Sequence, residues 1–375
     1  MSFSTGVLKN DERAIYSLRD LYKKYGYSLY KVNKFEEYDL YARNKSFLVS
    51  SNILSFTDTD GKLLALKPDI TLSIVKNIAD GDTNTHKYCY NETVYRTSAD
   101  SDGFREIMQT GLECIGSIDV FSECEVISLA LRSLDTISED YLLDLSHMGF
   151  VDGLLSEALV DDGAKGDIIG MIKSKNAHSL RKLCERYGLG GEMIERLCAI
   201  TEMYLPVTKA LPILEKIVVG ERMRAAYENI CRISEAMVAE GKADKVFVDF
   251  SVVNDVNYYD GVCFKGFVNG IPDSVLSGGR YDKLVERLGK KFGAIGFAVY
   301  LDKLERMGEA EVLYDVDVVL TYDDSADVKS VIRMRNQLID NGESVLVGTS
   351  PDPSLRYRRL VKLTEGGLEI LETND

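Results

Sequence analysis

Hydrophobic residues near the start of the chain recur at the three- and four-residue spacing of a helix. Residues 11–25 carry this pattern, and Gly26 follows as a stop signal. The apolar positions that share the face are Ile15, Leu18, Leu21 and Tyr22. The pattern therefore predicts an amphipathic helix over residues 11–25.

Short apolar runs separated by turn residues come next, which is typical of strands and hairpins. A polar turn at 57–61 predicts a hairpin over 54–66, and a helical pattern resumes at 71–79. Two longer runs, 88–95 and 105–115, predict a pair of long strands joined by a polar loop.

The pattern changes to successive helices between about residue 152 and residue 240. Strand-like segments return at 246–250 and 261–264, and a further helix is expected near 296–307. The helices therefore form an insert that interrupts one sheet.

The end of the chain has a pattern of its own. A strand at 316–320, a helix at 328–340 and a strand at 344–347 predict a small appended α/β unit. We place the boundary so that a large domain covers residues 1–312 and a small domain covers residues 313–375.

Composition and charge narrow the class of protein. With 375 residues, of which 45% are hydrophobic and 28% charged, the chain is typical of a folded protein with two domains. A polar start and the lack of a long apolar run predict a cytoplasmic protein that does not span a membrane. The net charge of −15 disfavours stable tRNA binding, because nucleic-acid affinity depends on Lys and Arg neutralising phosphates.

The cysteines and histidines give no reason to expect a metal or another cofactor. Seven cysteines, an odd number, never form a C-x-x-C pair and lie mostly in apolar runs, so we expect reduced thiols. The three histidines are widely separated, which argues against a zinc site and against a Cys-His nucleophile pair.

One face of the expected strand 105–115 carries polar residues. Because side chains alternate along a strand, Arg105, Gln109 and Glu113 share a face, and Gly111 leaves a gap between the last two. A cation, an amide and a carboxylate suit the charged ends of an amino acid. Taken alone, the spacing favours an ordinary solvent-facing strand surface, and it does not decide between the two interpretations.

Four other candidate residues have structural as well as functional explanations. Thr71 opens the helix expected at 71–79, and Asp69 precedes it, where it is well placed as a cap. Tyr258 and Tyr259 enter a turn and could be core residues or could stack on a planar ligand. The glycines of 277–282 match neither a P-loop nor a dinucleotide motif.

Taken in chain order, these segments resemble the histidyl-tRNA synthetase family over most of residues 11–307. The resemblance implies an α+β fold, the antiparallel sheet flanked by helices of class II aminoacyl-tRNA synthetases. The segments are GYSLYKVNKFEEYDLY (26–41, motif 1), LLALKPDITLSIVK (63–76), KYCYNETVYRTSADSDGFREIMQTGLECIG (87–116, motif 2), VNDVNYYDGVCF (253–264, similar to R-G-L-D-Y-Y) and SGGRYDKLVERLGKKFGAIGFAVYLDKL (277–304, into motif 3).

The departures from the family fall where the synthetase chemistry takes place. The arginine that opens R-G-L-D-Y-Y and attends the reacting carboxylate and phosphate is Asn254, and the adenine-stacking arginine of motif 3 is Lys303 with Tyr300 replacing a nearby glycine. Loss of a fixed positive charge aimed at developing negative charge should cripple adenylation. Further departures are Asn33, Ser98 and Asn257.

The amino-acid end of the family's site is better kept. The positions that match histidine-binding residues of the family are Asp69, Thr71, Arg105, Gln109, Glu113, Tyr258 and Tyr259. A chain that keeps the amino-acid pocket but lacks the residues for adenylation resembles the regulatory subunit of ATP phosphoribosyltransferase, a synthetase paralogue. Residues 144–149 also resemble the D-x-G-H-x-G stretch of that subfamily.

This second resemblance implies a chain without catalytic residues. It implies that the chain activates a short-form ATP phosphoribosyltransferase catalytic subunit, binds free histidine as a feedback inhibitor, and forms a homodimer through the motif 1 region within a hetero-oligomer. Two alternatives stay open at this point. The chain could be a divergent histidyl-tRNA synthetase, or a free-standing amino-acid sensor with another partner.

Overall fold

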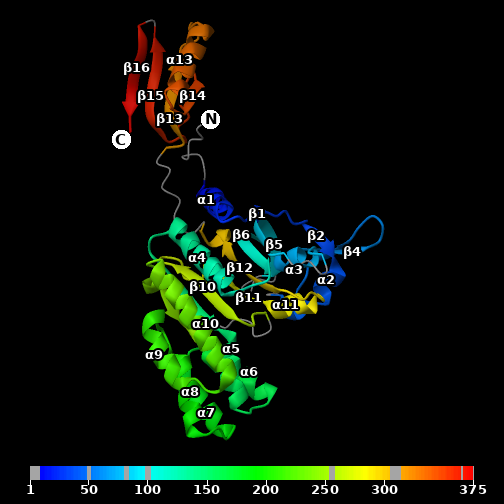
Figure 1. The fold of residues 1–375 in the computed structure, drawn as a ribbon. Helices are drawn as coiled ribbons and strands as arrows, with labels where there is room; N and C mark the ends of the chain where they lie inside the picture. The colour runs from blue at the N-terminus through cyan, green and yellow to red at the C-terminus, as the bar shows by residue number, and fades with distance from the viewer. Residues whose placement is uncertain are drawn as a thin grey trace. The chain divides into compact units, whose positions relative to one another are not determined.

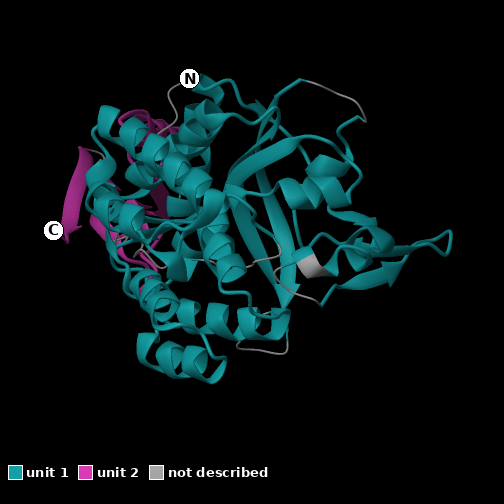
Figure 2. Cartoon of the chain, turned by 60° about the horizontal axis from the view of Figure 1, so that its bottom comes forward, with its two compact units in different colours: residues 1–307 teal, residues 308–375 magenta. Residues whose placement is uncertain are grey.

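The computed structural model describes residues 9–48, 52–79, 84–97, 103–252, 258–304, 314–364 and 366–374. The chain divides into two compact units, residues 1–307 and 308–375 (Figure 2). The domain boundary expected at residue 312 falls within 305–313, outside the described residues.

The first unit is built around one large sheet (Figure 1). Within the described residues its strand order is β1-β5-β6-β12-β11-β10-β7-β9-β8, and pairing is antiparallel from β5 through to β7. The expected antiparallel sheet with flanking helices is therefore confirmed. The strands are β1 (Ser28–Leu29), β5 (His86–Thr97), β6 (Phe104–Gly116), β7 (Tyr141–His147), β8 (Leu205–Pro206), β9 (Val246–Val248), β10 (Val262–Val268), β11 (Leu276–Arg280) and β12 (Gly293–Tyr300).

Helices α1 (Asn10–Lys24) and α4 (Val120–Ile137) pack on the same face of this sheet. Tyr22 of α1 meets the edge of the Phe297 ring on β12 at a centroid distance of 5.9 Å, and its hydroxyl hydrogen-bonds Ser133 of α4 at 3.0 Å. The apolar stripe expected on α1 is thus part of this chain's own core. Gly26 has a φ of 83° and ends the helix, because glycine adopts this conformation without steric cost.

The successive helices expected between residues 152 and 240 are present. The short strand β8 divides them, and β9 returns the chain to the large sheet beside β7. The helices are α5 (Met148–Glu157), α6 (Asp162–Lys173), α7 (Ala177–Arg186), α8 (Gly191–Glu202), α9 (Val207–Ile217) and α10 (Gly220–Ala239). Figure 1 shows them in green.

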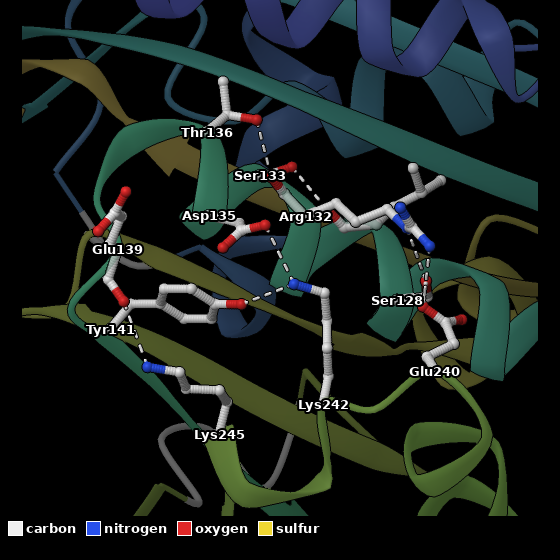
Figure 3. A network of polar contacts seen from close by, with 11 residues as sticks. Ser128, Arg132, Ser133, Asp135, Thr136, Glu139, Tyr141, Glu240, Lys242 and Lys245 are labelled. Carbon is white, nitrogen blue, oxygen red and sulfur yellow. Dashed lines mark hydrogen bonds and ion pairs between the residues drawn. The ribbon is translucent and has the colours of Figure 1, made fainter.

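A polar network fastens the end of this insert to the rest of the unit (Figure 3). Glu240, directly after α10, accepts hydrogen bonds from Ser128 at 2.7 Å and from Arg132 at 3.3 Å, both on α4. Lys242 donates to Asp135 of α4 and to the Tyr141 hydroxyl of β7, each at 3.1 Å. The end of the insert is therefore fixed against α4 and β7.

The hairpin expected over 54–66 is also present, as β3 and β4 in a small sheet of order β2-β4-β3. The helix expected at 71–79 is α3, which ends at Lys76. The remaining elements of the first unit are β2 (Phe35–Glu37), α2 (Tyr38–Ala42), η2 (Lys45–Phe47), β3 (Ser55–Thr57), β4 (Leu63–Leu66), α3 (Thr71–Lys76), η3 (Ala243–Lys245), η4 (Phe250–Val252), α11 (Asp282–Arg287) and α12 (Leu301–Leu304).

One predicted element is wrong in kind. The helix expected near 296–307 begins only at Leu301, because 293–300 form the strand β12 between β6 and β11. A central strand is buried on both faces, so its sequence is a nearly continuous apolar run that lacks a clear period of two. Gly296 and the bulky Phe297 and Val299 favour the strand over a helix.

The second unit is a four-stranded sheet of order β14-β13-β15-β16 with one helix, within the residues that are described. The expected strand, helix and strand correspond to β13, α13 and β14, and two further strands follow. The elements are β13 (Val316–Tyr322), α13 (Val328–Asp340), β14 (Val345–Gly348), β15 (Tyr357–Thr364) and β16 (Gly367–Thr373).

Candidate ligand-binding site

A cavity of about 170 Å³ lies on the face of the large sheet that α4 leaves uncovered. Leu112 and Phe297 point into the core beneath α4, so the alternate residues Glu113 and Gly296 point to the other side. Segments far apart in the sequence meet there, namely the start of α3, the strand β6 and the turn before β10.

Glu113 is the centre of the cavity's polar contacts, and only 2% of it is exposed. The Thr71 hydroxyl donates to its Oε1 at 2.6 Å, and the Tyr281 hydroxyl donates to its Oε2. Burial raises the pKa of the Glu113 carboxyl to about 8, although both hydrogen bonds act to lower it. An arriving cation would favour the ionised form of this carboxyl, because a nearby opposite charge lowers the pKa of a buried acid.

Asp69 is a second buried carboxyl beside the first. Its Oδ1 accepts a hydrogen bond from the Leu72 backbone amide at 2.9 Å, so it does act as a cap for α3, and the residue also lines the cavity. Burial raises its pKa, and the Arg96 guanidinium, 4.0 Å from Oδ2, partly offsets that effect. Arg96 is held by a hydrogen bond from its Nε to the Pro68 carbonyl at 2.7 Å.

Gln109 leaves a buried donor without a partner. The side chain is 3% exposed and lines the cavity, and its Nε2 donates to no acceptor in the described part of the chain. A buried amide nitrogen that makes no hydrogen bond costs about 1–3 kcal/mol. A ligand that brings an acceptor to this position would recover that cost.

Aromatic rings and glycines give the cavity its shape. The rings of Tyr258 and Tyr259 meet edge to face at 4.8 Å, and Tyr258 lies 5.8 Å from the ring of Tyr281. Gly279 is required beneath Tyr259, because a Cβ there would come within 2.6 Å of the ring. Gly296 is required beneath Glu113, because a Cβ there would overlap Oε2 of the carboxyl.

The part of the cavity that the synthetase resemblance assigns to the nucleotide is altered. The Tyr300 hydroxyl and Ser277 Oγ are 2.6 Å apart, so this large side chain is fixed across β12 and β11 and lines the cavity. Lys303 points elsewhere, since its Nζ donates to the Ser274 carbonyl at 2.8 Å. Ser98, Asn254 and Asn257 lie outside the described residues.

Six of the seven candidate residues come together. Asp69, Thr71, Gln109, Glu113, Tyr258 and Tyr259 all line the cavity. Arg105 does not line it, since this residue is exposed and faces Arg96 across the β5–β6 ladder, near the projecting end of the hairpin. Alternation along β6 placed Arg105 on the same face but could not show that the strand runs on beyond the cavity. Its part in binding stays a prediction.

Two important lining residues were not among the candidates. Tyr281 lies within the G-G-R-Y-D stretch, so the family resemblance offered a signal for it. Lys265 lies in the middle of β10 and lines the cavity, and no motif marked it.

Within the described residues there is no cluster of three or more His, Cys, Asp or Glu side chains that could hold a metal, and no helix long and apolar enough to span a membrane.

The fold and the cavity define a class of protein. The model of the histidyl-tRNA synthetase family matches residues 7–304, and the chain belongs to that family. Among its relatives is the ATP phosphoribosyltransferase regulatory subunit of Oceanobacillus iheyensis, which is 22% identical over 375 residues, covering 98% of this chain and 92% of the relative.

Two solved structures share the fold. The ATP phosphoribosyltransferase regulatory subunit/histidyl-tRNA synthetase of Bacillus halodurans C matches with a TM-score of 0.79 and 21% identity, covering 96% of each chain. A chain of the ATP phosphoribosyl transferase (HisG:HisZ) complex of Thermotoga maritima matches with a TM-score of 0.62 and 18% identity, covering 78% of this chain and 97% of that one. The class II synthetase fold expected from the sequence is therefore confirmed.

Proposed function

We propose that this chain is a non-catalytic regulatory subunit of ATP phosphoribosyltransferase and acts in the cytoplasm in histidine biosynthesis. It assembles with a short-form catalytic subunit, activates that subunit and makes it sensitive to inhibition by free histidine. The names of its relatives support this role, as does the likeness to a chain of the Thermotoga maritima complex.

The composition of the cavity carries the proposal. Asp69, Thr71, Gln109 and Glu113 supply acceptors and an unused donor for a small charged ligand, as an amino-acid pocket requires. The half that would hold a nucleotide contains Tyr300, fixed against Ser277. A pocket that keeps its amino-acid groups and loses its nucleotide groups suits an effector site better than a site of adenylation.

The lining residues suggest how histidine would bind. It lies between Gln109, Glu113 and the pair Tyr258 and Tyr259, with Glu113 or Asp69 facing the ammonium group. Burial and the neighbouring Asp69 raise the pKa of Glu113, so a cationic ligand group beside it would favour its ionisation.

The assembly we propose is a homodimer through the motif 1 region inside a hetero-oligomer with the catalytic subunit. The buried stripe of α1 is not available for such contacts, but Tyr16 and Leu29 are 57% and 56% exposed in the same region. Stable tRNA binding is not part of the role, because a net charge of −15 opposes contacts to phosphates.

The decisive experiment mixes this protein with the short catalytic subunit encoded in the same genome. We expect co-elution in gel filtration, a rise in turnover on mixing, and loss of that turnover when histidine is added. Two variants are compared in parallel, Glu113→Ala in the cavity and Glu106→Ala, an exposed glutamate on the same strand. Only the first should reduce the sensitivity to histidine.

Other outcomes would contradict the proposal. If the two chains elute apart, or if the catalytic subunit is fully active alone, a free-standing amino-acid sensor becomes the better explanation. Equal histidine sensitivity in wild type and Glu113→Ala would place the effector site elsewhere on the complex.

A further inference from the structure

The cavity has acidic groups on one side and a basic group on the other. Asp69 and Glu113 supply carboxyls beside β6, and Lys265 supplies an ammonium group from β10. The sheet register places Lys265 opposite Ser277, Ser277 opposite Ala298, and Ala298 opposite Gly111 on β6. Three strand spacings separate the two sides, about 14 Å between backbones, and the long side chains of lysine and glutamate reach into that space from the same face.

Lys265 has no counter-ion within ion-pair distance in the described part of the chain. Asp144 lies directly opposite on β7, and no ion pair joins the two. Burial and the neighbouring Asp249 raise the pKa of Asp144 to about 7, so it is only partly ionised near neutral pH, and its Oδ1 makes no hydrogen bond. Asp144 therefore compensates Lys265 incompletely.

The other charges near Lys265 make an anion still more favourable. Burial lowers the pKa of the Lys265 ammonium group, and the nearby lysines Lys303 and Lys173 lower it further. Cations that repel one another in a partly buried place are stabilised when a negative group arrives. The cavity's second cation, Arg96, is already engaged, because it donates to the Pro68 carbonyl and lies 4.0 Å from Asp69.

A free amino acid is a zwitterion, and this arrangement suits both of its charges. The carboxyl side of the cavity receives the ammonium group or a cationic side chain, and an unpaired cation is needed at the other side for the carboxylate. We infer that Lys265 binds the carboxylate of the amino acid and makes the site selective for ligands that carry one. The inference rests on the proposed function in taking free histidine as the effector.

The test compares histidine with histamine, which has the same imidazole and amine but lacks the carboxylate. A charge-assisted hydrogen bond contributes about 1.5–3 kcal/mol, so wild type should bind histidine roughly 10- to 150-fold more tightly than histamine. In Lys265→Met this preference should fall to a few-fold, while affinity for histamine changes little. Lys265→Arg should keep most of the preference, because it keeps the charge.

The control is Lys216→Met, which removes an exposed lysine on α9 and changes the net charge equally. It should behave as wild type in calorimetry with both ligands. Thermal unfolding of each variant shows whether it is folded. If Lys265→Met does not fold, the comparison of the two ligands in Lys265→Arg still tests the inference.

The outcomes separate this inference from the function on which it rests. If Lys265→Met loses affinity for histidine and histamine equally, or for neither, Lys265 does not bind the carboxylate. If wild type still co-elutes with the catalytic subunit and responds to histidine in that case, the proposed function stands without this inference. If wild type binds no histidine at all, the role of Lys265 and the effector role are both overturned.

Discussion

Thr71 and Glu113 are joined by a hydrogen bond of 2.6 Å from the threonine hydroxyl to Oε1 of the carboxyl. The bond ties the first residue of α3 to the second half of β6, across a separation of 42 positions in the sequence. Asp69, which caps the same helix, lies in the same cavity. A ligand that engages Glu113 therefore acts directly on the start of α3.

Removal of the Glu113 carboxyl should weaken binding of histidine. Loss of one partner from a buried, charge-assisted hydrogen bond costs about 1.5–3 kcal/mol, so Glu113→Ala should raise the dissociation constant roughly 10- to 150-fold. Isothermal calorimetry measures this, with Glu106→Ala on the exposed end of β6 as the matched control. Equal affinity in wild type and Glu113→Ala would move the site elsewhere.

The raised pKa of Glu113 predicts that stability depends on pH. With a folded pKa of about 8 against an ordinary 4.5, the folded chain holds a proton that the unfolded chain releases between these values. The free energy of unfolding should therefore fall as the pH rises through this window and change no further above it. Glu113→Gln has no proton to lose, so between about pH 5 and 9 it should lose less stability than wild type, by roughly 4 kcal/mol.

Urea unfolding at several pH values checks this dependence. Asp144, whose pKa is raised to about 7, should contribute in the same direction, so Asp144→Asn should also flatten the profile. Glu106→Gln removes an exposed carboxyl and should leave the profile unchanged. Parallel profiles for wild type and Glu113→Gln would show that Glu113 is ionised in both states.

Gly296 should not tolerate even an alanine. A Cβ at this position would overlap Glu113 Oε2 and the Leu112 carbonyl, and the carbonyl belongs to a central strand that cannot move away. Gly296→Ala should lower the free energy of unfolding by roughly 1–3 kcal/mol and displace Glu113, which weakens histidine binding as well. Chemical unfolding and calorimetry measure the two effects.

Gly166 provides the control for this substitution. It lies inside α6, and a Cβ there would meet nothing within 4 Å. Gly166→Ala should raise stability by up to about 1 kcal/mol, because alanine favours a helix. If both glycine variants changed stability alike, the close approach of Glu113 to β12 would not be the cause.

The sequence predicted the elements that repeat a simple pattern and was less informative about central strands. The helix at 10–24 has a clear period and a glycine stop, and it is found within a residue of the expected position. β12 has no such pattern, because both of its faces are buried, and its sequence from 296 onwards predicts a helix instead.

The candidate site shows a similar limit. Gln109 and Glu113 share a strand, so alternation placed them together, and the family resemblance made a pocket the better explanation of that face. Lys265 comes from another strand, and its place opposite Ser277 depends on a register that no local pattern gives. Contacts between distant strands are therefore the part of the site that required the structure.

The last prediction concerns the chemistry that the family resemblance would otherwise imply. The purified chain should neither form histidyl-adenylate nor charge tRNA. Tyr300, fixed against Ser277, lines the part of the cavity that would hold the nucleotide, and Lys303, which donates to the Ser274 carbonyl, does not line the cavity. Asn254 also lacks the positive charge that would stabilise the reacting phosphate, a contribution of several kcal/mol in such sites.

Histidine-dependent pyrophosphate exchange is the assay, with an active histidyl-tRNA synthetase as the positive control. Exchange by this chain above the no-enzyme background would contradict the prediction and favour a divergent synthetase. Asn254→Arg alone should not produce exchange, because Tyr300 still occupies the nucleotide half of the cavity. If that single substitution did restore exchange, the missing charge would be the whole defect, and the position of Tyr300 would have to be compatible with bound ATP.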